Sequence, residues 1–173
     1  LQAPKEATDA MDLGSAFHLL ALEPEREGAA LAVWAEGARR GKAYEAWEAA
    51  NAGKLLLTQA AYDTAKAMAQ SVRSSPQAKP YLAGGESEVT LQWEEVDALL
   101  SHNTQMKGRC DYLLPDVVVD LKATRSAAVE PFGKQMFDAK VHAQIALYRS
   151  GAFKRDGLMR RGVLIATDNT FPY

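Results

Sequence analysis

The chain has 173 residues, of which 47% are hydrophobic and 24% are charged, and its formal net charge is −2. This length fits one domain that can bury a substantial core. The charge excludes a globally basic nucleic-acid-binding protein, and the single cysteine excludes a disulfide framework or a cluster held by four cysteines of this chain.

The first part of the chain is predicted to be helical. Asp12 is expected to cap an amphipathic helix that ends at Pro24. The Ala- and Glu-rich segment 25–52 is also expected to be helical, with breaks at Gly37 and Gly41. Thr58 is expected to cap a second amphipathic helix that ends before Pro76. The apolar face of the first helix carries Leu13, Phe17, Leu20 and Ala21. That of the second carries Tyr62, Ala65, Ala69 and Val72.

The second part of the chain predicts most of the strands. Alternating polarity predicts a strand at 88–93, and residues 94–107 are expected to form a loop or a short helix. The stretch 108–122 predicts a hairpin, because Pro115-Asp116 is a turn signal between two runs that read as adjacent strands.

The last part is expected to contain one helix from about 133 to 153 and a core strand at 163–166. Three or four helices around a mixed sheet of four or more strands give an α/β or α+β core. Because the chain starts without Met and stops soon after a core strand, we expect one domain, residues 1–173, that is a fragment or trimmed at both ends. Without a signal peptide or membrane-length apolar run in this sequence, we expect a cytoplasmic protein.

The strand predicted at 117–121 carries charges that are costly to bury. Val117 to Leu121 is almost wholly apolar and β-branched, as in a strand buried on both faces. It ends in Asp120 and Lys122, whose side chains share one side because strand side chains alternate. A buried carboxylate is unfavourable unless a partner or a metal compensates its charge, so this pair indicates a special site.

A divalent-cation site would explain these charges. Mg²⁺ prefers oxygen ligands and usually takes one or two protein carboxylates, which Asp111 and Asp120 could supply. The Leu121 carbonyl could add a third oxygen, and Lys122 could orient or deprotonate a water, as phosphodiester hydrolysis requires. The alternative is a structural Asp120–Lys122 ion pair at a sheet edge, since short motifs often match by chance.

Three further features could join such a site. His18, on the first predicted helix, could be a metal ligand or an ordinary core histidine. Glu88, at the start of its strand, could hold a second ion or its waters, or be a solvated carboxylate. Gln144 and Tyr148 lie four residues apart on one helix face, and could contact a phosphate or simply be buried hydrogen-bonding groups.

These features occur in a fixed order along the chain. The motifs are Gly14–Leu20 followed by Leu22–Glu25, Glu88 to Trp93, Arg109 to Asp111, Asp120–Thr124, and His142–Tyr148 with the pattern Q-x-x-x-Y. Through them the sequence resembles the RecE/RecB-type branch of the PD-(D/E)XK nuclease superfamily, and most closely the RecE-like (exonuclease VIII) nuclease domains. The resemblance covers most of the chain and implies a restriction-endonuclease-like core with a central mixed β-sheet flanked by helices.

The resemblance implies a metal centre at matching positions. His18, Asp111 and Asp120 would be ligands of Mg²⁺ or Mn²⁺, with the Leu121 carbonyl as an additional oxygen. Glu88 would belong to the site as a ligand or as a neighbour of the ligands.

The resemblance also implies roles beside the metal. Lys122 would position or activate the attacking water, and Gln144 and Tyr148 would support the site and the scissile strand. The literal Pro-Asp pair offers Asp116 as the first acid, but its place in the predicted turn favours Asp111 as the partner of the strand acid.

The implied activity is metal-dependent exonucleolytic digestion of linear double-stranded DNA from 5′ ends. Implied with it are a bacterial or phage origin, a homo-oligomer and a RecT-like single-strand annealing protein as partner. The basic residues expected to contact DNA, unless they are merely solvated surface, are Arg39, Arg40, Lys42, Lys107, Arg109 and Arg125. The alternatives are an endonuclease on the same fold and a catalytically silent DNA-binding or scaffold module.

Overall fold

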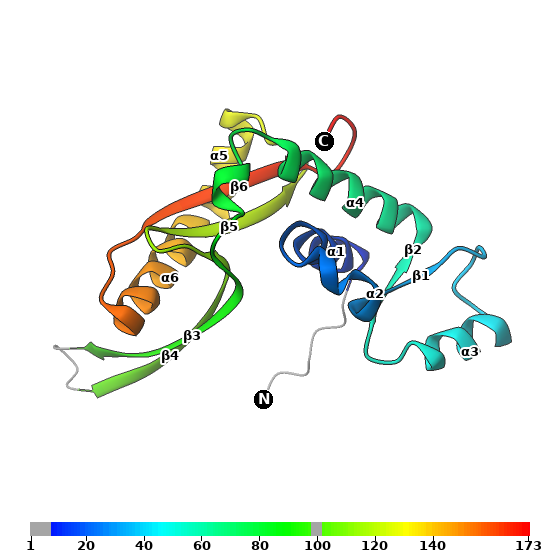
Figure 1. Cartoon of the computed structure of the whole chain (residues 1–173), viewed down its shortest axis with the longest axis horizontal. Coiled ribbons are helices and arrows are strands. Elements are labelled where there is room, and N and C mark those ends of the chain that lie inside the picture. The colour runs from blue at the N-terminus through cyan, green and yellow to red at the C-terminus, as the bar shows by residue number, and fades with distance from the viewer. Residues whose placement is uncertain (1–7, 98–101) are drawn as a thin grey trace.

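A computed structural model describes residues 8–97 and 102–173 and shows a mixed α/β fold (Figure 1). The first half contains α1 (Asp9–Leu22), η1 (Pro24–Arg26), α2 (Glu27–Ala30), β1 (Leu31–Trp34), α3 (Lys42–Ala50), β2 (Leu55–Thr58), α4 (Gln59–Ser74) and η2 (Lys79–Tyr81). The second half contains β3 (Glu86–Asp97), β4 (His102–Leu113), β5 (Val117–Thr124), α5 (Val129–Asp138), α6 (Val141–Asp156) and β6 (Arg161–Asp168). Among the described residues, none of the helices combines the length and apolar character that crossing a membrane requires.

The two amphipathic helices expected in the first half are α1 and α4. Thr58 caps α4 as predicted, since its side chain accepts a hydrogen bond from the Ala61 N–H. The predicted Asp12 cap of α1 is wrong, because Thr8 has the extended backbone of an N-cap and accepts from the Met11 N–H. Asp12 instead lies in the first turn, where its charge favours the helix dipole.

The expectation of helical structure over 25–52, broken at Gly37 and Gly41, is wrong at Leu31–Trp34. These residues form β1, which pairs in parallel with β2 from Leu31–Leu55 to Trp34–Thr58. Parallel strands require a crossover, and α3 supplies it. Pairing with a distant apolar segment therefore overrides the helical propensity of the Ala- and Glu-rich sequence.

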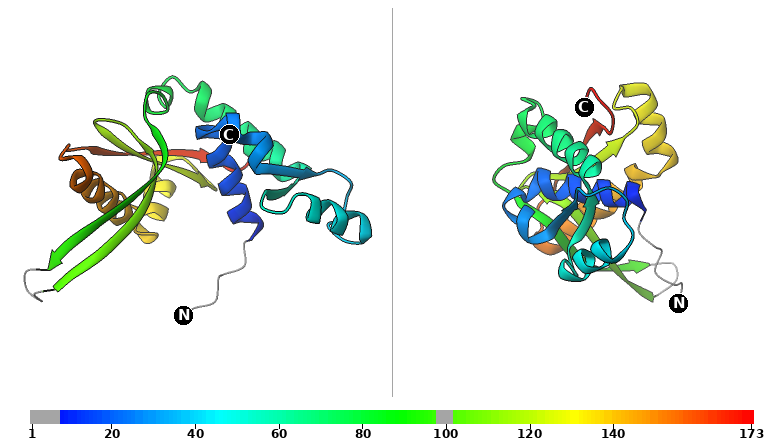
Figure 2. Two further views of the ribbon diagram at one scale, coloured as in Figure 1. Left: turned by 60° about the horizontal axis from the view of Figure 1, so that its bottom comes forward. Right: turned by 90° about the vertical axis from the view of Figure 1, so that its right-hand side faces the viewer.

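The main sheet has the order β3-β4-β5-β6, with β3, β4 and β5 antiparallel and β6 parallel to β5. Residues 94–97 and 102–107, expected as loop or short helix, instead belong to β3 and β4. The two strands form a long ribbon that projects from the body of the molecule (Figure 2). The pairing of β3 with β4 continues along this ribbon to Asp97–His102. A ribbon with few buried positions needs little apolar sequence, which explains why the local pattern did not predict it.

The helix expected from about 133 to 153 is two helices, α5 and α6. They are separated at Ala139–Lys140, where Lys140 has a left-handed backbone with φ +57°. No glycine or proline marks the break, so the local sequence gave no signal. The last strand, β6, lies where the apolar run 163–166 predicted it.

Strand β5 is buried on both faces, as its composition predicted. Val117, Val119 and Leu121 pack in the cluster formed with α1 and α4, whereas Val118 packs in a second cluster that includes Ala152 of α6. The alternation of the strand therefore directs Asp120 and Lys122 toward the α6 side. The predicted hairpin and its turn at Pro115-Asp116 are confirmed.

Candidate metal centre

The candidate site lies where β4 and β5 separate. Their pairing is limited to Tyr112–Val119 and Leu113–Val118. Beyond it, the Leu121 N–H donates to Asp111 Oδ2 at 2.6 Å, and the Leu121 carbonyl lies 3.1 Å from His18 Nε2 on α1. Two site side chains thus satisfy the backbone groups of β5 that the ladder leaves free, and this fixes both side chains against the strand.

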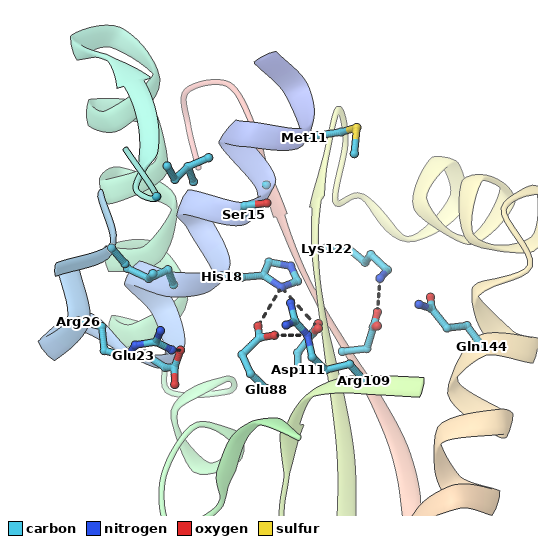
Figure 3. A pocket seen from close by; sticks show the side chains of 16 residues that line it. Met11, Ser15, His18, Glu23, Arg26, Glu88, Arg109, Asp111, Lys122 and Gln144 are labelled. Carbon is cyan, nitrogen blue, oxygen red and sulfur yellow. Dashed lines mark hydrogen bonds and ion pairs between the residues drawn. The ribbon is translucent and has the colours of Figure 1, made fainter. Parts of the chain in front are cut away.

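Three ligand-type side chains converge at this split (Figure 3). His18 Nδ1 lies 3.5 Å from Asp111 Oδ1 and 3.9 Å from Glu88 Oε1. One potential ligand atom from each of the three residues lies within 4.8 Å of the others. Arg109 Nε holds the second oxygen of Glu88 at 2.8 Å. Mixed imidazole and carboxylate donors at this spacing suit a divalent cation such as Mg²⁺ or Mn²⁺.

Asp120 is a buried acid whose charge is only partly compensated. Its residue is 1% exposed, and Lys122 Nζ lies 2.6 Å from Oδ2. The angle of this contact falls outside ordinary hydrogen-bond geometry, so Lys122 is the charge partner of Oδ2 but not a well-aligned donor to it. Burial, together with the charge of Asp111, raises the pKa of Asp120 above its usual value despite Lys122. A cation beside Asp120 would offset that cost.

The pKa values of His18 and Glu88 are also shifted by the neighbouring carboxylates. Burial lowers the pKa of His18, but the hydrogen bond and charge of Asp111 and the charge of Glu88 outweigh it, and the net shift is upward. Burial also raises the pKa of Glu88, and Asp111 adds to this shift while Arg109 opposes it. The site therefore favours positive charge, in agreement with a cation-binding role.

These residues line one cavity of about 710 Å³. It contains six of the residues predicted for metal binding or catalysis: His18, Glu88, Asp111, Asp120, Lys122 and Gln144. The Gln144 amide donates to the Tyr148 hydroxyl at 2.7 Å, so Tyr148 is linked to the cavity through Gln144 rather than lining it. The turn residue Asp116 lies outside the cavity with its side chain 74% exposed.

The basic residues predicted to contact DNA are spread over several elements. Arg109 lines the cavity, while Arg40, Lys42 and Arg125 are exposed and do not line it. Lys107 is exposed on the ribbon. The guanidinium of Arg39 donates to the Leu56 carbonyl at 3.1 Å and lies 3.6 Å from Asp9, which gives it a structural role as well.

The cavity also contains polar or flexible side chains to which the sequence gave no site role, among them Met11, Ser15, Glu23 and Arg26. Met11 and Ser15 lie seven and three residues before His18 and share its helix face, so helical spacing from His18 could have identified them. Glu23 and Arg26 form an ion pair at 2.5 Å on another side of the cavity. They lie beyond the end of α1, where no periodic pattern indicated them.

The backbone of Glu88 is strained. It has φ +51°, a left-handed conformation that side-chain-bearing residues rarely adopt. Neighbouring pairs Ser87–Tyr112 and Val89–Cys110 keep the strand register, so the distortion is local to Glu88. It occurs at the position where the carboxylate enters the cavity.

This strain predicts that Glu88→Gly is more stable than Glu88→Gln. Both changes remove the carboxylate, but only glycine adopts positive φ without a steric cost, which favours it by about 1 kcal/mol. Denaturant unfolding of the metal-free proteins measures the difference. Equal stabilities, or a less stable glycine variant, would show that the left-handed backbone carries no strain.

Comparisons with known proteins concern the fold and the family of this chain. A protein of Eubacterium rectale, whose crystal structure is described as a "putative exonuclease", matches with a TM-score of 0.57 and 16% sequence identity over 97% of this chain. The match covers 57% of that protein, so this chain spans little more than half of its length, and the likeness is one of fold. A search of curated proteins gave no match. Residues 1–172 match the model of a family described as a PDDEXK-like domain of unknown function (DUF3799), and the chain therefore belongs to that family.

Proposed function

We propose that this protein is a Mg²⁺- or Mn²⁺-dependent exonuclease that hydrolyses phosphodiester bonds of linear double-stranded DNA from 5′ ends. The observation that carries the proposal is the buried Asp120, paired with Lys122 and incompletely satisfied, in the same cavity as His18, Glu88 and Asp111. A purely structural Asp120–Lys122 pair would not need an imidazole and two more carboxylates around it.

The donor set fits a hard divalent cation, which when bound would supply an activated water and neutralise charge on the phosphate. Asp111 is oriented for this role, because Leu121 N–H occupies its Oδ2 and leaves Oδ1 facing His18. His18 Nε2 lies 3.1 Å from the Leu121 carbonyl, which can only accept a hydrogen bond, so Nε2 carries the proton and Nδ1 is the ring nitrogen free to bind a cation, 3.5 Å from Asp111 Oδ1.

Lys122 is the group placed to act on the nucleophile. Its side chain is 24% exposed and its ammonium lies beside Asp120, so it can contact both a carboxylate and a water in the cavity. In the ammonium form it positions the water and stabilises negative charge on the phosphate. The Gln144 amide, held by Tyr148, is a further hydrogen-bonding group for the scissile strand.

The exonuclease assignment is supported by the sequence resemblance to RecE-like domains, from which the linear duplex substrate and the 5′ polarity follow. On the same basis we infer a homo-oligomer and a RecT-like annealing partner. A fold alone does not fix a substrate, so these features require direct tests.

End-labelled linear duplex and covalently closed circular DNA distinguish the possibilities. With Mg²⁺ or Mn²⁺, we expect the linear duplex to be degraded from its 5′ ends, the closed circle to remain intact, and EDTA to abolish the activity. Cleavage of the closed circle would identify an endonuclease instead. Binding without cleavage under any of these metal conditions would identify a DNA-binding or scaffold module.

A further inference from the structure

The cavity that contains the metal donors extends along α1 beyond them. Its lining residues there are Met11, Gly14 and Ser15. They precede His18 by seven, four and three residues, which places them on the same helix face as that histidine. Figure 3 shows Met11 and Ser15 on the side of the cavity that carries His18, across from Gln144. Met11, Gly14 and Ser15 therefore form a wall, here called the α1 wall, that adjoins the metal donors.

The cavity is larger than a metal ion and its ligands require. Its volume is about 710 Å³. Six water-sized ligands around a cation displace about 180 Å³, at about 30 Å³ each. The remaining volume lies within the range of sites that bind drug-sized ligands, about 300–1,000 Å³. The cavity therefore accommodates a nucleotide next to the ion, alongside the α1 wall.

Gly14 keeps the α1 wall open. It lies in the interior of α1, where glycine destabilises a helix relative to alanine. Its backbone has no positive φ that would require glycine. A Cβ on Gly14 would meet no atom within 4 Å beyond the adjoining backbone of α1, in the part of the chain that the structure describes. The backbone and the packing of the folded chain thus leave the choice of residue open, whereas a ligand passing close to the helix would require glycine.

We propose that the α1 wall is a subsite for the sugar–phosphate backbone of the DNA strand next to the scissile phosphate, with the closest approach at Gly14. This subsite depends on the proposed function, since its ligand is the substrate of the same metal centre. The exposed Ser15 hydroxyl is a donor for a phosphate oxygen, and Met11, 50% exposed, packs against the sugar. The acid on this side, Glu23, is neutralised by Arg26, so it does not repel a polyanion. Contacts to sugar and phosphate accept any sequence.

Substitutions in the α1 wall test the proposal through DNA binding. The probe is a hairpin DNA with fluorescein in its loop and one open duplex end. Fluorescence anisotropy in Ca²⁺, which takes oxygen ligands as Mg²⁺ does, gives its Kd, and a gel verifies that the probe stays intact. Gly14→Leu is expected to weaken binding by about 5- to 150-fold, the range for forcing a side chain into occupied space. Ser15→Ala, which removes a hydroxyl without adding volume, should weaken it by about 2- to 10-fold.

Gly133→Leu is the matched control. Gly133 lies in the interior of α5 and outside the cavity, and a Cβ there would also meet no atom within 4 Å in the described structure. The same substitution at this position should leave the Kd of the probe unchanged. Both leucine variants should unfold at or above the wild-type temperature, because leucine is a better helix former than glycine. Weaker DNA binding by a Gly14→Leu variant of undiminished stability therefore excludes misfolding as the cause.

Metal binding separates the α1 wall from the metal donors. Mn²⁺ titrated calorimetrically into Gly14→Leu without DNA should bind with the wild-type Kd, because the wall supplies no ligand. Parallel losses of Mn²⁺ and DNA binding would place the effect at His18, one helical turn away, and would overturn the proposal. Equal Kd values of the DNA probe for Gly14→Leu and Gly133→Leu would also overturn it.

The same variants distinguish this inference from the proposed function. Wild type that binds the probe through the α1 wall but hydrolyses no DNA in Mg²⁺ or Mn²⁺ would refute the proposed function and leave the subsite intact. Gly14→Leu that binds and digests linear duplex as wild type does would refute the subsite and leave the proposed function intact.

Discussion

Asp120→Asn is expected to lower metal-dependent DNA hydrolysis by about 10³-fold or more. The substitution keeps the shape of the side chain but removes a ligand charge, and losing metal-based stabilisation of the phosphate costs several kcal/mol in the transition state. Initial rates of linear-duplex digestion measure the effect. Because burial raises the pKa of Asp120, its ionised form is costly in the folded metal-free protein, so unfolding in EDTA should occur at an unchanged or higher temperature.

Asp116→Asn is the matched control, since Asp116 is the other acid of the hairpin and lies outside the cavity. It should digest DNA at the wild-type rate. Mg²⁺ or Mn²⁺ at 100 times its Kd should stabilise wild type and Asp116→Asn by about 2.7 kcal/mol, but should stabilise Asp120→Asn far less. An Asp120→Asn variant with undiminished activity, or an inactive Asp116→Asn variant, would reverse the assignment of the two acids.

The second large effect concerns stability. Arg160, at 6% exposed, binds both oxygens of Asp156 at 2.8 and 2.6 Å, and its Nε donates to the Leu114 carbonyl at 2.8 Å. It thereby connects the α6–β6 loop to the β4–β5 turn. Arg160→Met should lower the free energy of unfolding by on the order of 3 kcal/mol, because it leaves a partly buried carboxylate and a carbonyl without their partner. Denaturant titration measures the loss.

The neighbouring Arg161 provides the control. Its side chain is 62% exposed and lies 4.0 Å from Asp116, so Arg161→Met should cost less than about 1 kcal/mol. Similar losses for the two variants would contradict a special role for Arg160.

The Arg160–Asp156 pair also predicts a pH dependence. Hydrogen bonds from Arg160 hold the pKa of Asp156 at about 2, below its usual 3.8. A lowered pKa means that the pair stabilises the fold above pH 3.8 and that this contribution is lost as pH falls through about 2. The difference in stability between wild type and Asp156→Asn should therefore shrink over that range. A difference that stays constant down to pH 2 would exclude the ion pair as its cause.

The sequence by itself determined the elements whose signals are local. Thr58 and the apolar period after it predicted α4, because a cap and an amphipathic face are properties of a few neighbouring residues. The β-branched run ending in Asp120 and Lys122 predicted a doubly buried strand with a costly acid, because alternation and desolvation can both be judged from the strand alone. The turn signal at Pro115-Asp116 is also local, and it favoured Asp111 over Asp116 as the acid that acts with Asp120.

Only the tertiary structure decided features that depend on distant partners. The segment 31–34 became a strand because β2 pairs with it, and Arg160 became an anchor because the β4–β5 turn lies against it. The position of the site at the separation of β4 and β5 also follows from long-range contacts. There His18, 103 residues away in sequence, reaches the Leu121 carbonyl. Local propensity cannot encode such contacts, because their free energy is gained only when remote segments meet.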